Sequence, residues 1–346
     1  MSTDRYHRQT LLPQIGPAGQ AKLAASRVLL IGCGALGTVL ADYLVRAGVG
    51  WLRIVDRDLV EPTNLQRQTL FVEADVDQPK AVAAAARLRQ VNSRSTIEPL
   101  VADVFAGNVE HLTDVRGDGP MVDLVLDGTD NAETRYLVND VAVKHGVPWV
   151  YGAAVAVEGR VMAIDPRAGT PCLRCVFPQP PAVGQLATCD TAGVLGPAAG
   201  VTASLQAAAA IRLLVGGGTN HVLTSFDAWD GRLRTLSLAD AKRDDCPACG
   251  HRRFEFLDAV AVPTVTLCGR DAVQVRPATP TRLVLRELAM TLARSGKVEA
   301  TPHLLRFASD GALRVRLTVF ADGRVIVHGT TRADEARSVV ARYVGT

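Results

Sequence analysis

The sequence predicts an α/β protein with a doubly wound, mainly parallel, Rossmann-like sheet that antiparallel strands continue, followed by a small C-terminal α+β domain. Three observations lead to this prediction. Short apolar runs alternate with helical patterns over residues 28–151, hairpin patterns replace them after about residue 152, and the pattern changes again from Val260. Alternating strands and helices are typical of a parallel sheet, whereas successive hairpins build antiparallel strands.

The first half contains five strand patterns and three helical patterns. A short apolar run that ends at a turn residue is typical of a buried parallel strand. We expect strands at residues 28–31, 51–55, 97–101, 122–126 and 148–151, and helices at residues 36–47, 79–91 and 134–145. Pro79 suits a first helical turn, where a missing N–H costs nothing.

The second half divides into a continuation of the sheet and a separate domain. We expect hairpins within residues 155–164 and 221–238, and a helix after Pro197. Beyond Val260, weak alternation at residues 265–275, a helix at 283–294, a hairpin at 313–327 and a helix at 333–343 form a smaller pattern. We therefore expect domains at residues 1–258 and 264–346, with Val262-Pro263 as the linker.

Composition and charge narrow the class of protein. In 346 residues, 48% are hydrophobic and 21% charged, which is ordinary for a packed globular chain. The net charge of +3 is too small to indicate binding to nucleic acid or to an anionic membrane. The first ten residues have no apolar core, so we expect no secretory signal and a cytoplasmic location.

Residues 191–211 carry no charge and are long enough to raise the possibility of a membrane span. Pro197, three glycines, Gln206 and many alanines give this segment a poor insertion energy. Small residues also allow close helix packing within a folded domain. We therefore predict a buried helix and no membrane partner.

A glycine-rich turn follows the first predicted strand and opens the first predicted helix. Gly32, Gly34 and Gly37 let the backbone approach a phosphate, and the helix N-terminus favours an anion. Asp56 ends the next strand, where an acid can bind a ribose hydroxyl. These residues alone would also suit a nicotinamide cofactor, or a turn that is tight for packing reasons only.

Polar residues after the second strand favour a triphosphate. Asp58 is followed by Asn64 and Arg67, and Lys80 follows a proline. Arg67 and Lys80 could stabilise the charge that develops when an α-phosphate is attacked and pyrophosphate leaves, and Asn64 could contact the other phosphates. The alternatives are a solvated surface charge for Arg67 and an ordinary first-turn helix residue for Lys80.

The segment Asp127-Gly128-Thr129-Asp130-Asn131 follows the fourth predicted strand. Ligands of such sheets bind beyond the carboxyl ends of the strands. Asp130 could hold Mg²⁺ that bridges phosphate oxygens. The alternative role for Asp130 is an N-cap of the next helix, because aspartate is a preferred cap.

Two Cys-x-x-Cys pairs stand far apart, Cys172/Cys175 and Cys246/Cys249. Four thiolates suit a tetrahedral, structural Zn²⁺ site in which protein fills every position. A redox pair is the alternative for a single Cys-x-x-Cys, and two such pairs make it less attractive. A fifth cysteine, Cys189, lies between the pairs in a glycine-rich stretch.

Several motifs in order give this sequence a recognisable resemblance. It resembles the MoeB/ThiF branch of the ubiquitin-activating-enzyme superfamily over about residues 1–255. The matching motifs are Arg5-Tyr6-x-Arg8-Gln9, the glycine turn, Asp56-x-Asp58 with Asn64-Leu65-Gln66-Arg67-Gln68, Gln78-Pro79-Lys80, Asp127-x-Thr129-Asp130-Asn131, Thr188-Cys189 before Gly193-Val194-Leu195-Gly196-Pro197, and the paired cysteines.

The resemblance implies an ATP-dependent adenylyltransferase. Such enzymes use the C-terminal Gly-Gly carboxylate of a small β-grasp, ubiquitin-like sulfur-carrier protein to attack the α-phosphate of ATP. The products are an acyl-adenylate and pyrophosphate. A cysteine desulfurase or rhodanese then supplies sulfur for a thiocarboxylate, in molybdopterin, thiamine or tRNA-thiolation pathways.

The resemblance also implies roles by position. Asp56 would hold the ribose, Asp130 would bind Mg²⁺, and Arg8 would reach into the partner subunit's ATP site, which implies a homodimer. The other nucleotide-binding positions would be Gly32, Gly34, Gly37, Asp58, Asn64, Arg67, Lys80 and Asn131.

Three questions stay open from the sequence. Cys189 either forms a covalent intermediate with the carrier or is only a loop cysteine, since sequence shows neither its access nor its pKa. Residues 260–346 contain one cysteine, Cys268, so we do not expect sulfurtransferase activity within this chain. A nicotinamide-dependent oxidoreductase and a non-catalytic zinc scaffold that binds a β-grasp protein remain the alternative functions.

Overall fold

The computed structural model describes residues 4–115, 119–181, 192–259, 264–267 (backbone only), 271–277, 282–310 and 315–345. Its contacts divide the chain into two compact units, Met1–Ala259 and Val260–Thr346. The linker expected at Val262-Pro263 lies outside the described residues.

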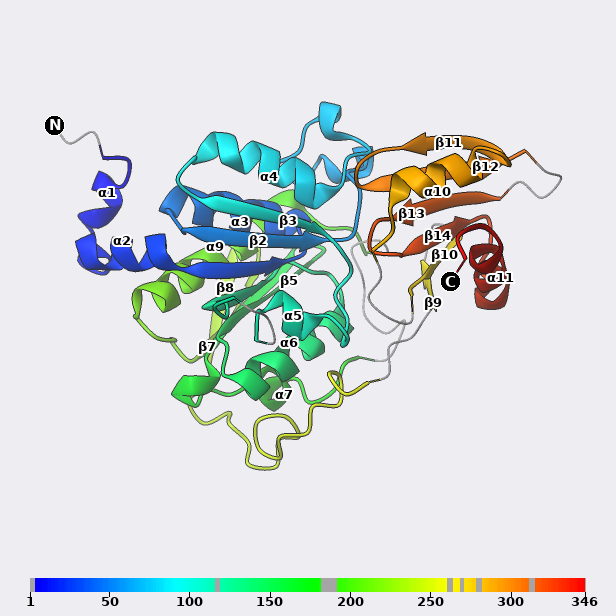
Figure 1. The fold of residues 1–346 in the computed structure, drawn as a ribbon. Helices are drawn as coiled ribbons and strands as arrows, with labels where there is room; N and C mark the ends of the chain where they lie inside the picture. Colours follow the sequence, from blue (N-terminus) through cyan, green and yellow to red (C-terminus); the bar gives the residue numbers. More distant parts are fainter. Residues whose placement is uncertain are drawn as a thin grey trace. The chain divides into compact units, whose positions relative to one another are not determined.

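The first unit is built on an eight-stranded sheet with the order β3-β2-β1-β4-β5-β6-β7-β8 (Figure 1). Strands β3 to β5 pair in parallel and β5 to β8 pair antiparallel, which confirms the predicted fold class. The strands are β1 (Arg27–Ile31), β2 (Trp51–Asp56), β3 (Thr96–Val101), β4 (Leu124–Asp127), β5 (Trp149–Val155), β6 (Glu158–Ile164), β7 (Val222–Asp227) and β8 (Arg232–Ser237).

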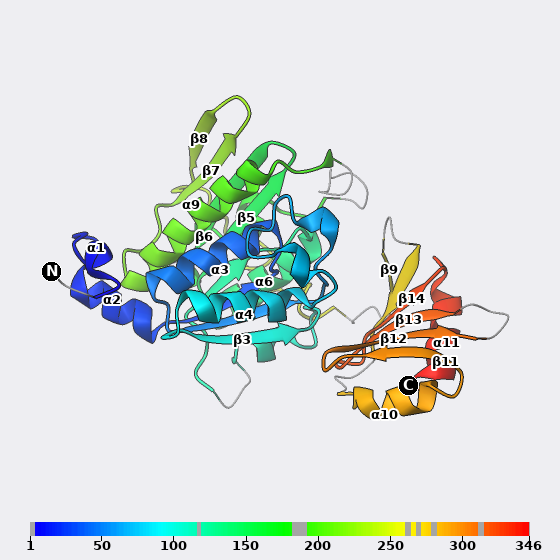
Figure 2. The same ribbon diagram turned by 90° about the horizontal axis from the view of Figure 1, so that it is seen from above.

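Helices cover both faces of this sheet because the apolar residues of its buried strands alternate between two cores. Val28 and Leu30 of β1 face one core with α3, α4 and α9, which lie side by side in Figure 2. Leu29 and Ile31 face the other core with α6. The helices are α1 (His7–Thr10), α2 (Gly16–Ala25), α3 (Ala35–Ala47), α4 (Lys80–Val91), α5 (Val109–Leu112), α6 (Ala132–His145), α7 (Leu173–Val176) and α9 (Gly196–Val215), with 3-10 turns η1 (Pro62–Asn64), η2 (Glu73–Asp75) and η3 (Pro166–Ala168).

Helix α9, whose one charged residue is Arg212, has the length and composition that would allow a membrane crossing, with a mean hydropathy of 1.5 over an 18-residue stretch. A core helix of a folded domain passes the same test. In this structure α9 packs against α3, β5 and β6, and Gln206 on α9 donates to the carbonyl of Asp127 (2.8 Å). These contacts pack one face of α9 against the sheet and α3 of the first unit.

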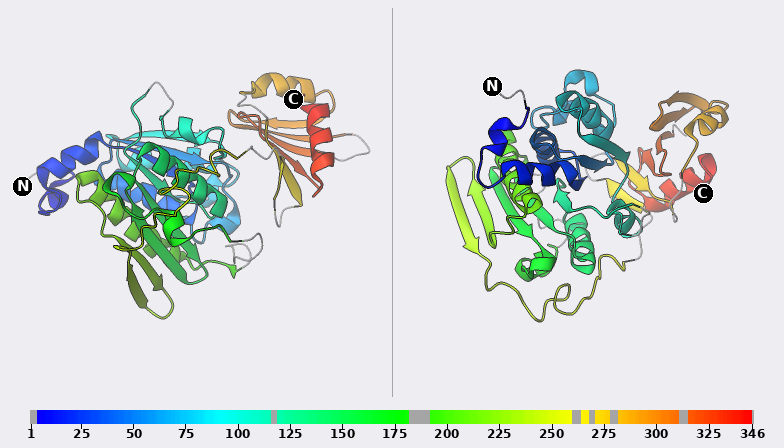
Figure 3. Two further views of the ribbon diagram at one scale, coloured as in Figure 1. Left: turned by 90° about the horizontal axis from the view of Figure 1, so that it is seen from below. Right: turned by 60° about the vertical axis from the view of Figure 1, so that its left-hand side comes forward.

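The second unit is a six-stranded antiparallel sheet with the order β11-β12-β13-β14-β10-β9. Helices α10 and α11 contribute to the single core that covers one face of it, as Figure 3 shows. The elements are β9 (Thr264–Leu267), β10 (Ala272–Val275), α10 (Leu285–Leu292), β11 (Gly296–Ala300), β12 (Leu304–Ser309), β13 (Arg316–Phe320), β14 (Val325–His328) and α11 (Ala333–Tyr343).

The sheet order places the functional motifs at one edge. Strands β2, β1 and β4 are parallel neighbours, so their carboxyl ends meet. The glycine turn follows β1, Asp56 ends β2 and Asp127 ends β4. The chain changes direction across the sheet between β1 and β4, which is where ligands bind in open sheets of this type.

Candidate nucleotide site and cysteine cluster

The glycine turn is formed by backbone segments in very close contact. Gly32 has φ +87°, and a Cβ there would lie 2.7 Å from the carbonyl oxygen of Gly128. A Cβ on Gly37 or on Gly128 would collide with the carbonyl of Gly32. Gly34 is the N-cap of α3 and provides no side-chain cap, so the first N–H groups of α3 are available to an anion.

Asp56 links the end of β2 to the glycine turn. It is buried, and its two carboxylate oxygens accept hydrogen bonds from the backbone N–H of Cys33 (2.6 Å) and of Asp58 (2.7 Å). Burial raises the pKa of Asp56, and the nearby Lys80 ammonium opposes that rise. A carboxylate has about four acceptor sites, so it can still accept a hydroxyl group.

Lys80 begins α4 and is 6% exposed, so it is not a solvated first-turn residue. Its Nζ lies 3.4 Å from Oδ2 of Asp58. Burial alone would lower the pKa of Lys80, but Asp56 and Asp58 raise it above its usual value. The ammonium group therefore stays protonated and carries a fixed positive charge beside the glycine turn.

Asn64 and Arg67 lie on the connection after β2. Asn64 is buried at the end of η1, and its Oδ1 accepts a hydrogen bond from the N–H of Glu61 (3.2 Å). The guanidinium of Arg67 donates to the carbonyl of Thr63 (2.8 Å) and leaves other N–H groups for a ligand. A Cβ on Gly196 at the start of α9 would lie 3.8 Å from Cα of Arg67, so α9 supports this connection.

Asp130 and Asn131 follow β4 on the same edge. The N-cap of α6 is Asn131, whose Oδ1 accepts from the N–H of Glu133 (2.8 Å) and of Thr134 (3.4 Å). The N-cap alternative for Asp130 is therefore wrong. Asp130 is exposed, and one exposed carboxylate suits Mg²⁺, which is usually held by one or two carboxylates together with substrate phosphates.

Arg8 does not join this group in the structure. It lies exposed on α1, and a role in a partner subunit's site needs a second chain. Cys189 lies outside the described residues.

Two further residues at this edge received no role from the sequence. Gln68 is 3% exposed, its Oε1 has no hydrogen-bond partner among the described residues, and its Nε2 would lie 3.7 Å from a Cβ on Gly34. Arg135 on α6 binds Asp127 and two carbonyl groups. Gln68 stands in a recognised motif, whereas nothing in the local sequence distinguishes Arg135.

The four paired cysteines come together as one cluster. Their sulfur atoms all lie within 4.8 Å of one another, with distances of 3.9 Å (Cys172–Cys175), 3.6 Å (Cys172–Cys246) and 3.3 Å (Cys175–Cys249). A tetrahedral Zn²⁺ site with Zn–S bonds of about 2.3 Å would place its sulfur atoms about 3.8 Å apart. The cluster could therefore hold a metal ion of this kind.

Backbone hydrogen bonds bring the two cysteines of each pair close together. The N–H of Cys175 donates to the carbonyl of Cys172 (3.0 Å), and that of Gly250 donates to the carbonyl of Cys246 (3.0 Å), so each pair sits on a tight turn. Hydrogen bonds from the thiols of Cys172 and Cys249 lower the pKa of Cys175, which favours the thiolate that a metal needs.

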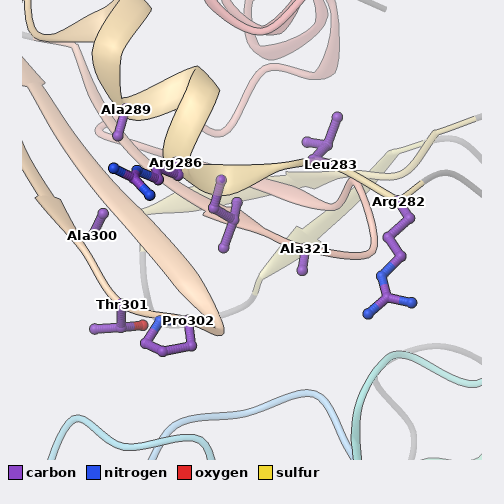
Figure 4. Close-up of a pocket in the computed structure, with 9 residues that line it drawn as sticks. Arg282, Leu283, Arg286, Ala289, Ala300, Thr301, Pro302 and Ala321 are labelled. Carbon is purple, nitrogen blue, oxygen red and sulfur yellow. The ribbon is translucent and has the colours of Figure 1, made fainter.

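The second unit contains a cavity of about 490 Å³ at the first turn of α10. Its walls are mainly apolar, with Arg282, Arg286 and Thr301 as the polar members. Figure 4 shows that Arg286 points toward Ala300 whereas Arg282 points away from it, so the two guanidinium groups do not converge. None of the predicted nucleotide-site residues lines this cavity.

The chain belongs to the ThiF family. The family's profile matches residues 6–248, which include the glycine turn, all the predicted nucleotide residues and the first three cysteines of the cluster.

Curated relatives match this chain at similar identities. The sulfur carrier protein ThiS adenylyltransferase of Bacillus subtilis is 43% identical over 99% of this chain and 100% of its own length. The SAMP-activating enzyme E1 of Haloferax volcanii is 41% identical over 74% of this chain and 92% of its own length. The adenylyltransferase and sulfurtransferase MOCS3 of Sus scrofa is 43% identical over 78% of this chain, and the match spans 57% of that longer protein.

Solved structures share the fold. A crystal structure of E. coli MccB with ATP superposes with a TM-score of 0.62 at 20% identity, over 72% of this chain and 75% of that chain. A structure of PaaA gives a TM-score of 0.56 at 22% identity, over 69% of this chain and 75% of that chain.

Proposed function

We propose that this protein is an ATP-dependent adenylyltransferase that activates the C-terminal carboxylate of a small ubiquitin-like sulfur-carrier protein. The observation that carries the proposal is the full-length match to the ThiS adenylyltransferase of Bacillus subtilis at 43% identity. The residues gathered at the carboxyl ends of β1, β2 and β4 support it, because they combine a phosphate turn, fixed positive charge and an exposed carboxylate.

In this proposal the chain's own groups bind and polarise ATP. Gly32, Gly34 and Gly37 admit the phosphates to the N-terminus of α3, and Asp56 accepts a ribose hydroxyl. The carrier carboxylate forms a bond to the α-phosphorus as the bond to the bridging oxygen of pyrophosphate breaks. Arg67 and Lys80 offset the negative charge that develops on the phosphates.

Three further residues hold the loops of the proposed nucleotide site in place: Asn64, Asp58 and Asn131. Asp58 pairs with Lys80, and Asn131 caps α6 directly after Asp130. Asp130 would hold Mg²⁺, which neutralises phosphate charge when it is bound. Cys172, Cys175, Cys246 and Cys249 would hold a structural Zn²⁺, which the distances between their sulfur atoms support.

The remaining parts of the proposal concern partners and location. We propose a homodimer in which Arg8 serves the partner subunit's site, a cysteine desulfurase or rhodanese as the sulfur donor, and a cytoplasmic location. Cys189 is proposed as a thiol that the carrier can reach. Thiamine synthesis is the first pathway to test, because the relative matched over its full length is named for ThiS.

The alternatives now have less support. An oxidoreductase gives no role to the buried Lys80 or to Arg67, and a titration with NADH that detected no binding would exclude it. A non-catalytic scaffold gives no reason for filled polar positions at the phosphate turn.

ATP–pyrophosphate exchange tests the proposal. We expect exchange only when a carrier ending in Gly-Gly is present, and a loss of at least about 100-fold in the variant Arg67→Ala, which keeps its affinity for the carrier. The control is Arg46→Ala, since Arg46 forms an exposed ion pair with Asp42 on α3. Exchange without any carrier, or normal exchange by Arg67→Ala, would contradict the proposal.

A further inference from the structure

We infer that Arg135 is a positioning residue that holds the loop carrying Asp130 in the geometry needed for the magnesium-bound triphosphate. The inference rests on the proposed function. It follows from a group of hydrogen bonds around Asp127, Thr129 and Gly152 that no sequence motif indicated.

Each polar group of Thr129 takes part in a hydrogen bond. Its N–H and its Oγ1 donate to Oδ1 of Asp127 at 2.9 and 2.7 Å. Its carbonyl accepts from Nη2 of Arg135 at 2.6 Å. That carbonyl belongs to the peptide that joins Thr129 to Asp130, so Arg135 fixes the plane from which the Asp130 side chain departs.

Arg135 joins three elements through one planar group. Its Nε donates to Oδ2 of Asp127 at the end of β4 (2.9 Å), and its Nη2 also donates to the carbonyl of Gly152 on β5 (3.0 Å). The side chain starts on α6 and is 13% exposed. Only a guanidinium has the fork of donors that satisfies a carboxylate and two carbonyls at once.

The guanidinium of Arg135 is a fixed positive charge. Burial would lower the pKa of Arg135, but Asp127 raises it above its usual value, so the guanidinium stays charged. The side chain of Asp127 is 2% exposed, so the ion pair lies in the interior of the first unit.

The same loop contacts the phosphate turn directly. The N–H of Gly128 donates to the carbonyl of Ile31 (2.8 Å), and a Cβ on Gly128 would collide with the carbonyl of Gly32. The loop after β4 is thus held by the turn on one side and by Arg135 on the other. Asp130 is the first exposed residue after these contacts. The peptide before it is held by Arg135, and its carboxylate is accessible to a ligand.

The test compares Arg135→Lys with Asp130→Asn and with the double variant, with Arg46→Lys as the matched control at an exposed ion pair. Lysine keeps the positive charge but lacks the several N–H donors that the guanidinium holds in one plane. We expect Arg135→Lys to lower kcat of ATP–pyrophosphate exchange about 10- to 100-fold, because small misplacements of reacting groups cost that much. The melting temperature should stay within about 3 °C of the wild type.

Two measurements distinguish a positioning role of Arg135 from an effect on the stability of the fold alone. The magnesium concentration at which ATP binding is half-maximal, measured by titration calorimetry, should rise several-fold in Arg135→Lys and stay unchanged in Arg46→Lys. In the Asp130→Asn background, Arg135→Lys should cause less than about a twofold further loss, because residues that act through one another are not additive.

The opposite results would overturn the inference. Wild-type magnesium dependence in Arg135→Lys, or an undiminished loss in the Asp130→Asn background, would show that Arg135 does not act through Asp130. Should Arg135→Lys fail to fold, Thr129→Val removes only the hydroxyl donor to Asp127 and should shift magnesium dependence in the same direction. Absence of exchange in the wild type would count against the proposed function alone, while the magnesium and ATP titrations would still test Arg135.

Discussion

Two buried positive charges in this protein, those of Lys80 and Arg135, are balanced by carboxylates from other elements of the fold. Lys80 is buried beside the carboxylates of Asp56 and Asp58, and Arg135 beside that of Asp127. An uncompensated buried charge would cost several kcal/mol, so each pair is needed for the stability of the fold. The same charged groups can also contribute to ligand binding.

Asp140 is the exception that yields a pH prediction. Its side chain is fully buried on α6, and it accepts a hydrogen bond from the N–H of Phe256 (2.9 Å). Burial raises the pKa of Asp140 to about 6. The folded state therefore binds more protons than the unfolded state between about pH 4 and pH 6, and this group makes stability fall as the pH rises through that window.

Asp140→Asn should remove this cost. Relative to the wild type, we expect the free energy of unfolding of the variant to increase between about pH 4 and pH 6 and then to level off, by at most about 3 kcal/mol. Urea unfolding at four pH values measures the difference. A difference that does not change with pH would show that Asp140 has an ordinary pKa.

At the scale of elements, the glycine turn depends on two chain segments, residues 31–37 and 128–129, whose backbones touch with no side chain between them. Gly37→Ala should abolish ATP binding, because its Cβ would collide with the carbonyl of Gly32. The control is Gly200→Ala in α9, which also lies in a helix and meets nothing within 4 Å. That variant should keep ATP affinity and gain up to about 1 kcal/mol of stability. Equal ATP affinities of the two variants would contradict this account.

The cysteine cluster ties α7 and the turn at residues 246–250 to the core around α6. Cys172→Ser should lose most of the bound zinc and lower the melting temperature by about 5–15 °C, since lost ligands cost several kcal/mol. Metal analysis of the wild type should give one zinc per chain. Full zinc content in the variant would show that Cys172 is not a ligand.

The sequence predicted the strands and helices that have a clear residue pattern within a short stretch of the chain. The apolar run at residues 28–31 and the glycines at 32–37 indicated both β1 and α3, and the polar residues at strand ends indicated the site. Helix α2 was missed because it contains a proline and two glycines and buries only Gly19 and Leu23. Strand β11 was missed because charged Lys297 and Glu299 flank its Val298.

Arg135 could not be found from sequence because its partners are two carbonyls and a carboxylate that only the folded sheet brings together. The alternative role of Asp130 as the cap of α6 was wrong for a similar reason. Asp130 and Asn131 are both good caps, and only backbone geometry selects Asn131.

For the whole molecule, the two units differ in charge. Residues 260–346 carry 13 Lys and Arg against seven Asp and Glu, whereas residues 1–259 carry 25 against 28. The relative from Haloferax volcanii matches 74% of this chain over 92% of its own length, so about a quarter of this chain lies outside that match. The first unit contains all the residues that we propose for the nucleotide site, and it contains the cysteine cluster.

A chain truncated after Ala259 should therefore fold and retain carrier-dependent exchange, with kcat within about threefold of the full chain. The basic second unit favours an acidic partner, so the truncated chain should have a higher KM for an acidic carrier, and that KM should respond less to salt. Loss of exchange at saturating carrier, with a normal melting temperature, would show that the second unit takes part in adenylation.

The most direct test of the central claim is the intact mass of a Gly-Gly-ended carrier captured on this protein in the presence of ATP. The account predicts a carrier heavier by one AMP, and no such species with Arg67→Ala. A captured carrier of unchanged mass, under conditions in which ATP is bound, would contradict it.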